Sequence, residues 1–314
     1  MKSYCFGIDV GGTSVKCGLF NTDGTLLEKW EIPTRTENKG ENILPDVAET
    51  IKAKIAEKNI DKDDIEGVGI GIPGPINSKG EAACAVNLYW GFTPVAQILS
   101  DLTGLKAQAG NDANVAALGE AWKGAAAGSQ NVIMVTLGTG VGGGIIIDGK
   151  IYSGSNFGGA EVGHTVISVD GPQCTCGRKG CFEVYSSATG LVRMTKEALE
   201  AHPESTMKEE EHISARTAFN YMRAGDATAK QVVDDYIKYL AAGITNTINI
   251  FQPDVLCIGG GVCNEGDPLL VPMKEIVKRE VYTRNSEKNT EIVIAALGND
   301  AGIIGAAFLG NAQD

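Results

Sequence analysis

A repeated pattern of strands and glycine-rich turns is the feature that most restricts how this chain can fold. Near the N-terminus, Ile8-Asp9-Val10-Gly11-Gly12-Thr13 ends one expected strand and leads into the next. The arrangement returns about 130 residues later as Thr136-Leu137-Gly138-Thr139-Gly140-Val141, a period far too long for a solenoid. In both places a hairpin with an Asp-Gly turn follows. We therefore expect two related α/β lobes that face one another.

The composition is that of an ordinary globular chain with a strong negative charge. Of the 314 residues, 43% are apolar and 21% are charged, and the formal net charge is −12. An acidic surface repels nucleic acids and anionic membranes, so we expect neither as a partner. No apolar run approaches the roughly 20 residues of a membrane span, and we expect no signal peptide in the first ten residues.

The eight cysteines also bear on the compartment. Three of them lie close together near a histidine, with a spacing that suggests a metal site. The others lie mostly in apolar segments. This usage indicates reduced thiols and a cytoplasmic protein.

Apolar periodicity and turn residues predict the remaining elements. The expected strands are 4–10, 15–20, 25–32, 65–72, 131–137, 145–147, 254–258 and 292–296. The expected helices are 42–57, 94–102, 112–123, 217–223, 227–249, one from about 269 onward, and 301–309. We expect 138–144 to form a turn and 202–212 an exposed loop or helix end.

The first glycine-rich turn carries the motif Asp9-x-Gly11-Gly12-Thr13. Two adjacent glycines let backbone N–H groups approach a phosphate. Thr13 can donate a hydroxyl, and Asp9 can hold Mg²⁺ directly or through water. A tight hairpin without a ligand is an equally good interpretation of this motif alone.

Two further glycine-rich segments lie in the second half of the repeat. Gly138–Gly144 holds five glycines in seven residues, and because each costs conformational entropy, a phosphate-binding loop explains them better than a structural role. The segment lacks the Gly-Lys-Ser/Thr ending of a P-loop. Ile258–Gly261 lies at a strand's carboxyl end, where α/β sheets bind ligands, and could make room for adenine or ribose. A plain turn explains it equally well.

The segment Asn111-Asp112-Ala113-Asn114 begins a predicted helix. Asp and Asn are common helix caps, so a purely structural role for Asp112 is a strong alternative. Beside a phosphate site, however, a carboxylate can take the proton of an attacking hydroxyl.

The fifth motif is His164-x9-Cys174-x-Cys176-x4-Cys181. Three thiolates and one imidazole at short spacing predict a closed, structural zinc site, with free buried thiols as the alternative. Glu161 and Glu183 flank this segment. A loop fixed by metal would aim both carboxylates into a common site, although they could also be solvated surface charges.

Together these motifs resemble the ROK family of repressors and sugar kinases, within the hexokinase–actin–chaperone ATPase superfamily. The resemblance covers essentially the whole chain. It implies an α/β fold of two ribonuclease-H-like (actin/hexokinase-like ATPase) lobes around a central cleft. We expect an N-terminal lobe from 1–120, joined by the C-terminal helix 301–314. The C-terminal lobe would be 121–300, with its zinc loop at 164–181.

The resemblance also implies roles for individual residues. Asp112 would be the catalytic base. The sugar would be held by Asn87, Asn111, Asp112, Glu161, His164 and Glu183. Zinc would be held by His164, Cys174, Cys176 and Cys181. The ATP phosphates would be bound by Gly11, Gly12, Thr13, Gly138, Thr139, Gly140 and Gly142. The motifs themselves, rather than the resemblance, suggest Asp9 for Mg²⁺ and Gly260 for the adenine or ribose of ATP.

The function implied is ATP-dependent phosphorylation of a hexose, most similar to bacterial glucokinases, in a protein that is a dimer. Kinases for N-acetylmannosamine, N-acetylglucosamine, fructose or allose are the alternatives within this class. A sugar-sensing repressor is an alternative of another class, and we expect no helix-turn-helix before Asp9. An actin- or chaperone-like ATPase would not need the predicted zinc loop.

Overall fold

The computed structural model describes residues 2–311, which belong to two compact units. Unit 1 consists of 1–132, 144–160 and 296–314, and unit 2 of 133–143 and 161–295. The last residues of the predicted helix 301–314 lie outside the described residues. The lobe limits expected at residues 120 and 300 stay a prediction for how the chain divides into folding domains.

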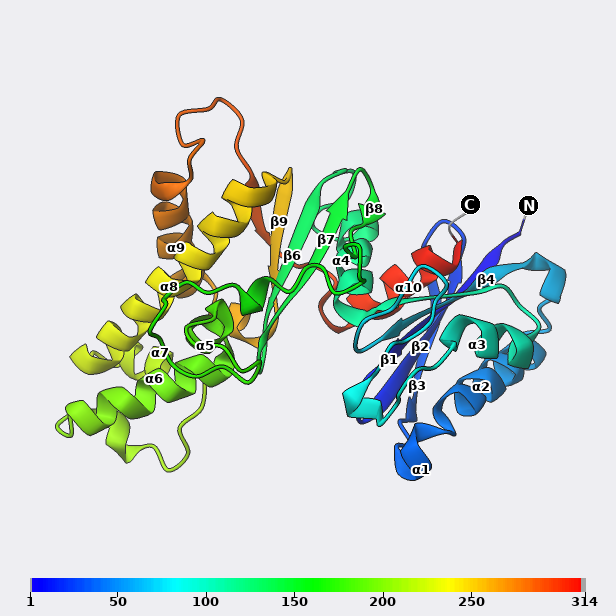
Figure 1. Cartoon of the computed structure of the whole chain (residues 1–314), viewed down its shortest axis with the longest axis horizontal. Coiled ribbons are helices and arrows are strands. Elements are labelled where there is room, and N and C mark those ends of the chain that lie inside the picture. Colours follow the sequence, from blue (N-terminus) through cyan, green and yellow to red (C-terminus); the bar gives the residue numbers. More distant parts are fainter. Residues whose placement is uncertain (1, 312–314) are drawn as a thin grey trace. The chain divides into compact units, whose positions relative to one another are not determined.

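Unit 1 is built on a five-stranded sheet with the order β3-β2-β1-β4-β5 (Figure 1). Its strands are β1 (Tyr4–Val10), β2 (Ser14–Asn21), β3 (Leu26–Pro33), β4 (Ile65–Ile72) and β5 (Ala107–Asn111). The first three are antiparallel neighbours, whereas β4 is parallel to both β1 and β5. Asp9 is paired with Gly71 and Asn111 with Ile72. The carboxyl ends of these parallel strands, with Asp9 and Asn111, therefore lie at one edge of the sheet.

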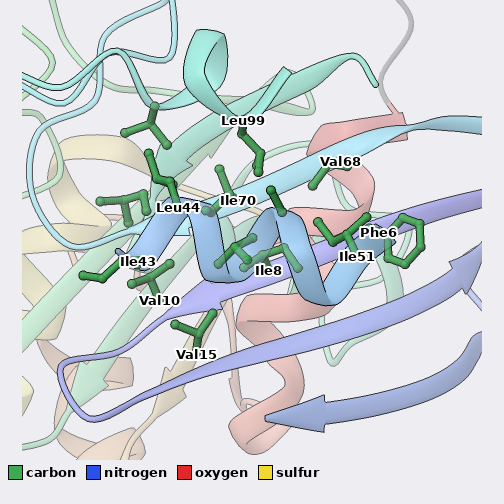
Figure 2. Packing of buried hydrophobic residues seen from close by; sticks show 14 of the residues in the cluster. Phe6, Ile8, Val10, Val15, Ile43, Leu44, Ile51, Val68, Ile70 and Leu99 are labelled. Atoms are coloured by element: carbon green, nitrogen blue, oxygen red, sulfur yellow. The ribbon is translucent and has the colours of Figure 1, made fainter. Parts of the chain in front are cut away.

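One face of this sheet is covered by α2 (Ile43–Glu57), which follows the short helical turn α1 (Glu37–Gly40) in the sequence. The helix α3 (Val95–Thr103) packs against α2. The buried residues of α2 recur at helical spacing, with Ile43, Leu44 and Ile51 among them. Figure 2 shows them against strand residues such as Ile8 and Ile70. Burying each such aliphatic side chain stabilises the fold by about 1.5–3 kcal/mol.

The other face of the sheet receives α10 (Ala301–Asn311), which packs on α4 (Asp112–Lys123). Gly7 and Gly69 alternate with the apolar strand residues and so point to this face. A Cβ at Gly69 would lie 1.7 Å from the carbonyl oxygen of Ala306, so only glycine lets the helix backbone approach so closely.

The second sheet has the strand order β10-β9-β6-β7-β8. Its strands are β6 (Val132–Leu137), β7 (Val141–Ile147), β8 (Lys150–Ile151), β9 (Val255–Gly259) and β10 (Glu291–Ile294). The helices of unit 2 are α5 (Phe182–Ser186), α6 (Ala188–Ala201), α7 (Thr217–Arg223), α8 (Ala227–Phe251) and α9 (Asp267–Glu280). The 25-residue helix α8 contacts all four others and so organises this layer.

Most predicted elements are confirmed to within two residues at each end, and the exceptions have physical reasons. The stretch 138–144 is not one turn, because β7 already begins at Val141. Gly142 belongs to that strand, and a Cβ there would lie 2.6 Å from Oγ1 of Thr136 on β6. The edge strand β5 was not predicted, because Ala-Gln-Ala-Gly-Asn contains no β-branched or aromatic residue.

The stretch 202–212 is not wholly exposed, since Ser205 and Met207 are buried around a short 3₁₀ turn, Thr206–Glu209. Within residues 2–311, the helices are too short or too polar to cross a membrane.

Candidate active site

Asn111 and Asp112 stand where β5 ends and α4 begins. The Asn111 side chain caps the helix, since its oxygen accepts a 3.1 Å hydrogen bond from the N–H of Asn114. Its Nδ2 donates to the carbonyl of Gly74 at 3.1 Å and to Oδ1 of Asp112 at 3.0 Å. The N–H of Ala113 donates to the same Oδ1 at 2.8 Å. The predicted base is therefore held in one orientation by its neighbours.

The surroundings of Asp112 also tune its protonation. Burial raises the pKa of its carboxyl to about 6, and the negative charge of Asp9 adds to this rise against the hydrogen bond from Ala113. Burial likewise raises the pKa of Asp9, opposed by the charge of Lys16. A carboxyl that titrates near pH 6 is suited to accept a proton at neutral pH.

The turn between β1 and β2 presents Gly11, Gly12 and Thr13 at the surface. It is braced from within, because Gly11 donates a 3.0 Å hydrogen bond to the carbonyl of Ser14 and accepts one of 2.7 Å from Oγ1 of Thr34. A Cβ at Gly12 would meet no atom within 4 Å, and its φ is not positive. Neither packing nor backbone strain requires glycine there, whereas the close approach of a ligand would.

In the second glycine-rich loop, Gly140 lies directly against the side chain of Glu183. A Cβ at Gly140 would lie 2.2 Å from Oε2 of Glu183, which accepts a 3.0 Å hydrogen bond from the N–H of Val141. Gly138, by contrast, has nothing within 4 Å of its Cβ position. One loop therefore holds an open glycine suited to a ligand and a packed glycine that seats Glu183.

The start of helix α6 holds this loop through two hydrogen bonds. The N–H of Ala188 donates to the carbonyl of Gly138 at 2.8 Å, and Oγ1 of Thr189 donates to that of Thr139 at 2.8 Å. Thr189 belongs to none of the motifs that predict the site. The signal available was Ser187, a helix-capping residue type directly before the helix it caps.

Gly260 follows β9 and also has a structural reason to be glycine. Its φ is 92°, and a Cβ there would lie 2.4 Å from the carbonyl oxygen of Leu137. This close contact between neighbouring segments explains the residue without a nucleotide.

The four predicted metal ligands are brought together in unit 2. One ligand atom from each of His164, Cys174, Cys176 and Cys181 lies within 4.8 Å of the others. Cys174 Sγ is 3.6 Å from His164 Nδ1, and Cys176 Sγ is 3.7 Å from Cys181 Sγ. Bonds of about 2.0–2.3 Å to a tetrahedral zinc place its ligand atoms about 3.5–3.8 Å apart. The donor set and these two separations therefore fit zinc.

The loop around this cluster is shaped by glycine and by local hydrogen bonds. Gly180 has a φ of 68°, and a Cβ there would lie 1.5 Å from the carbonyl oxygen of Ser168. The N–H of Arg178 is the main factor that lowers the pKa of the Cys176 thiol, which favours the metal-binding thiolate. Cys174 Sγ lies 3.8 Å from Oε1 of Glu183, so this carboxylate touches both the cluster and the glycine-rich loop.

Asn87 and Glu161 are placed differently, because both are exposed. Asn87 lies in the 3₁₀ turn Val86–Leu88, and Glu161 precedes the turn Val162–His164. Within residues 2–311, the structure shows no hydrogen bond to either side chain. Their assignment as sugar ligands rests on the resemblance.

The predicted residues fall into two groups. Unit 1 holds Asp9, Gly11, Gly12, Thr13, Asn87, Asn111 and Asp112, and unit 2 holds Gly138, Thr139, Gly140, Gly142, Glu161, His164, Cys174, Cys176, Cys181, Glu183 and Gly260. A cavity of about 700 Å³ in unit 1 runs along β5 to Tyr152 and Phe157. Among the predicted site residues, only Asn111 lines it.

The two five-stranded sheets, each with a glycine-rich turn between its first two strands in the sequence, define an α/β protein with the actin/hexokinase-like ATPase fold, as in solved structures with this arrangement. The model of the ROK family matches residues 5–313, and the chain belongs to that family. The predicted fold class and resemblance are thereby confirmed, while a cleft between the lobes stays a prediction.

Individual relatives are similar over nearly their full length. The chain is 40% identical to a glucokinase of Halalkalibacterium halodurans, over 98% of this chain and 95% of that protein. It is 36% identical to a glucokinase of Thermotoga maritima, over 98% and 97%. The structure of a ROK family glucokinase from Streptomyces griseus in complex with glucose and AMPPNP is similar with a TM-score of 0.74 and 32% identity, over 98% of each chain.

Proposed function

We propose that this protein is an ATP-dependent glucokinase that transfers the γ-phosphate of ATP to a hydroxyl of glucose. The observation that carries the proposal is the carboxyl of Asp112, fixed by Asn111 and Ala113 and given a pKa of about 6. Membership of the ROK family and the names of its full-length relatives support the same activity.

In this proposal Asp112 accepts the proton of the sugar hydroxyl as that oxygen attacks phosphorus. Asn111 orients the base through its 3.0 Å hydrogen bond and contacts the sugar. The exposed side chains of Asn87 and Glu161, together with Glu183 and His164, would supply further hydrogen bonds to sugar hydroxyls.

The nucleotide would be bound by the two glycine-rich turns. The open backbone at Gly12 and Gly138 suits close approach of phosphate oxygens to N–H groups. Asp9 at the carboxyl end of β1 would hold Mg²⁺, which neutralises charge on the phosphates.

The cysteine and histidine cluster would hold a structural zinc ion. It would fix the loop that carries Glu183, whose carboxylate lies between Cys174 and Val141. Zinc would thus support sugar binding by positioning a side chain.

The setting of the protein is also proposed. The cysteine usage of the sequence supports a reducing compartment, and we place the protein in the cytoplasm as a homodimer in glycolysis. The dimer is proposed from the family resemblance.

The alternatives are a kinase for another hexose and a sugar-sensing ROK protein without catalysis. A sensor has no need of a base poised near neutral pH, so the pKa of Asp112 favours an enzyme. The choice of glucose over N-acetylmannosamine, N-acetylglucosamine, fructose or allose rests on the relatives.

The deciding experiment is an ATP-coupled assay with these five sugars, with the Asp112→Asn variant purified in parallel to reveal any contaminating kinase. We expect the highest kcat/KM for glucose, a 6-phosphate product by phosphorus NMR, and little activity in the variant. A higher kcat/KM for another sugar would reassign the substrate. Phosphorylation of none of them would support the sensor.

A further inference from the structure

Glu120, near the end of α4, is a charged residue type with no part in the chemistry proposed above, yet its side chain is fully buried. Its two carboxylate oxygens accept three backbone hydrogen bonds. Oε2 receives the N–H groups of Ala125 at 2.8 Å and Ala296 at 3.1 Å, and Oε1 receives that of Leu297 at 2.8 Å. A buried carboxylate persists where such donors satisfy it.

The three donors lie at two particular places in the chain. Ala125 follows α4 on the segment that leaves unit 1 after Val132. Ala296 and Leu297 are the first residues of unit 1 after the chain returns from unit 2 for the second and last time. Of the four crossings between the units, the first follows Ala125 and the last precedes Ala296. One side chain thus holds the segment before the first crossing and the segment after the last crossing against the end of α4.

Two glycines show that the surrounding structure is built around this arrangement. A Cβ at Gly124 would lie 2.0 Å from Oε2 of Glu120, so only glycine leaves room for the carboxylate. A Cβ at Gly119 would lie 2.5 Å from the carbonyl of Ala301, so α4 also touches the start of α10. The returning segment is therefore anchored directly before it becomes α10.

We propose that Glu120 is a positioning residue that fixes two of the segments connecting the units to the helix that begins with Asp112. Through helix α4, this anchor couples the first and the last of the four crossings to the proposed catalytic base eight residues away. If unit 2 turns during the catalytic cycle, it would then turn about segments that are attached to α4 through Glu120. The proposal rests on the kinase function for its kinetic part only.

A Glu120→Gln substitution tests the anchor with little change in volume. The glutamine has one acceptor oxygen, and its NH₂ group would face backbone N–H groups that also donate. We expect amide exchange at Ala125, Ala296 and Leu297 to become at least about tenfold faster, which corresponds to the loss of roughly one hydrogen bond at each. Exchange in β1, β4 and β9 should remain as in the wild type.

In the kinase assay we expect kcat to fall roughly 10–100-fold, the effect of a small misplacement of reacting groups. KM for glucose should change little, and the ratio of ATP hydrolysis to sugar phosphorylation should rise. The matched control is Glu265→Gln, a carboxylate in unit 2 that is 7% exposed and paired with Arg223. It should show neither effect.

Should Glu120→Gln fail to fold, Gly124→Ala provides the same test, because its methyl group displaces the carboxylate without removing it. Unchanged exchange at the three amides, or accelerated exchange with unchanged kcat and hydrolysis ratio, would overturn the proposal. If the wild type phosphorylates no sugar, the proposed function fails, while amide exchange still decides whether Glu120 anchors the crossings.

Discussion

The side-chain amide of Asn111 donates to Oδ1 of Asp112 across 3.0 Å while its own oxygen caps the helix that Asp112 begins. The helix cap and the proposed catalytic carboxylate are therefore linked by a direct hydrogen bond. The cap is Asn111, which leaves the carboxylate of Asp112 available for the proposed role as base.

We expect Asp112→Asn to lower kcat by about 10²–10⁴-fold, the usual effect of losing a general base. The amide can still accept the hydrogen bond from Ala113, so sugar binding by calorimetry should stay close to the wild type. In the wild type, kcat/KM should decrease as the pH falls below about 6, because protonated Asp112 cannot accept a proton. Activity of the variant above a third of the wild type would exclude Asp112 as the base.

Although Asp112→Asn should lower kcat, it should raise the free energy of unfolding at neutral and alkaline pH. The pKa of Asp112 is raised from 3.8 to about 6 on folding, so the folded state loses stability from this group as the pH rises between those values. Asp112→Asn lacks this loss and should be more stable than the wild type at pH 8, with the difference shrinking toward pH 4. Denaturant titrations at several pH values measure this. A variant less stable at pH 8 than at pH 4, relative to the wild type, would contradict it.

Gly12→Ala and Gly140→Ala should separate ligand binding from packing. At Gly12 a methyl group meets no protein atom, so the free energy of unfolding should change by less than about 0.5 kcal/mol while KM for ATP rises several-fold. At Gly140 the methyl group displaces Glu183, so KM for the sugar should rise and the melting temperature should fall. Gly91→Ala, at another open glycine of unit 1, is the control for Gly12→Ala. An unchanged KM for ATP in Gly12→Ala would mean that this turn does not bind phosphate.

The purified protein should contain about one zinc per chain, given four ligands in one cluster. Cys176→Ser should lose the metal, lower the melting temperature and weaken sugar binding, because the loop that presents Glu183 loses its anchor. Cys84→Ser removes an exposed thiol outside the cluster and should keep its zinc. Fully active, metal-free wild type in elemental analysis would refute the site.

The sequence by itself determined most strands and helices, the fold class and the cluster of His164 with three cysteines. These features depend on local patterns, such as apolar alternation in β1 and β4 and the short spacing from Cys174 to Cys181. The strand β5 escaped prediction, because its residues take the extended form through pairing with β4 rather than through their own preference.

Only the tertiary structure decided what the individual glycines and acids do. Gly12, Gly140 and Gly260 look alike in the sequence, yet one is open, one seats Glu183 and one lies against Leu137. In the sequence Glu120 looks like an ordinary helix residue, and only the structure shows that the N–H groups of Ala125 and Ala296 donate hydrogen bonds to its carboxylate. Such roles depend on atoms distant in the chain, and the burial that raises the pKa of Asp112 exists only once those atoms are assembled.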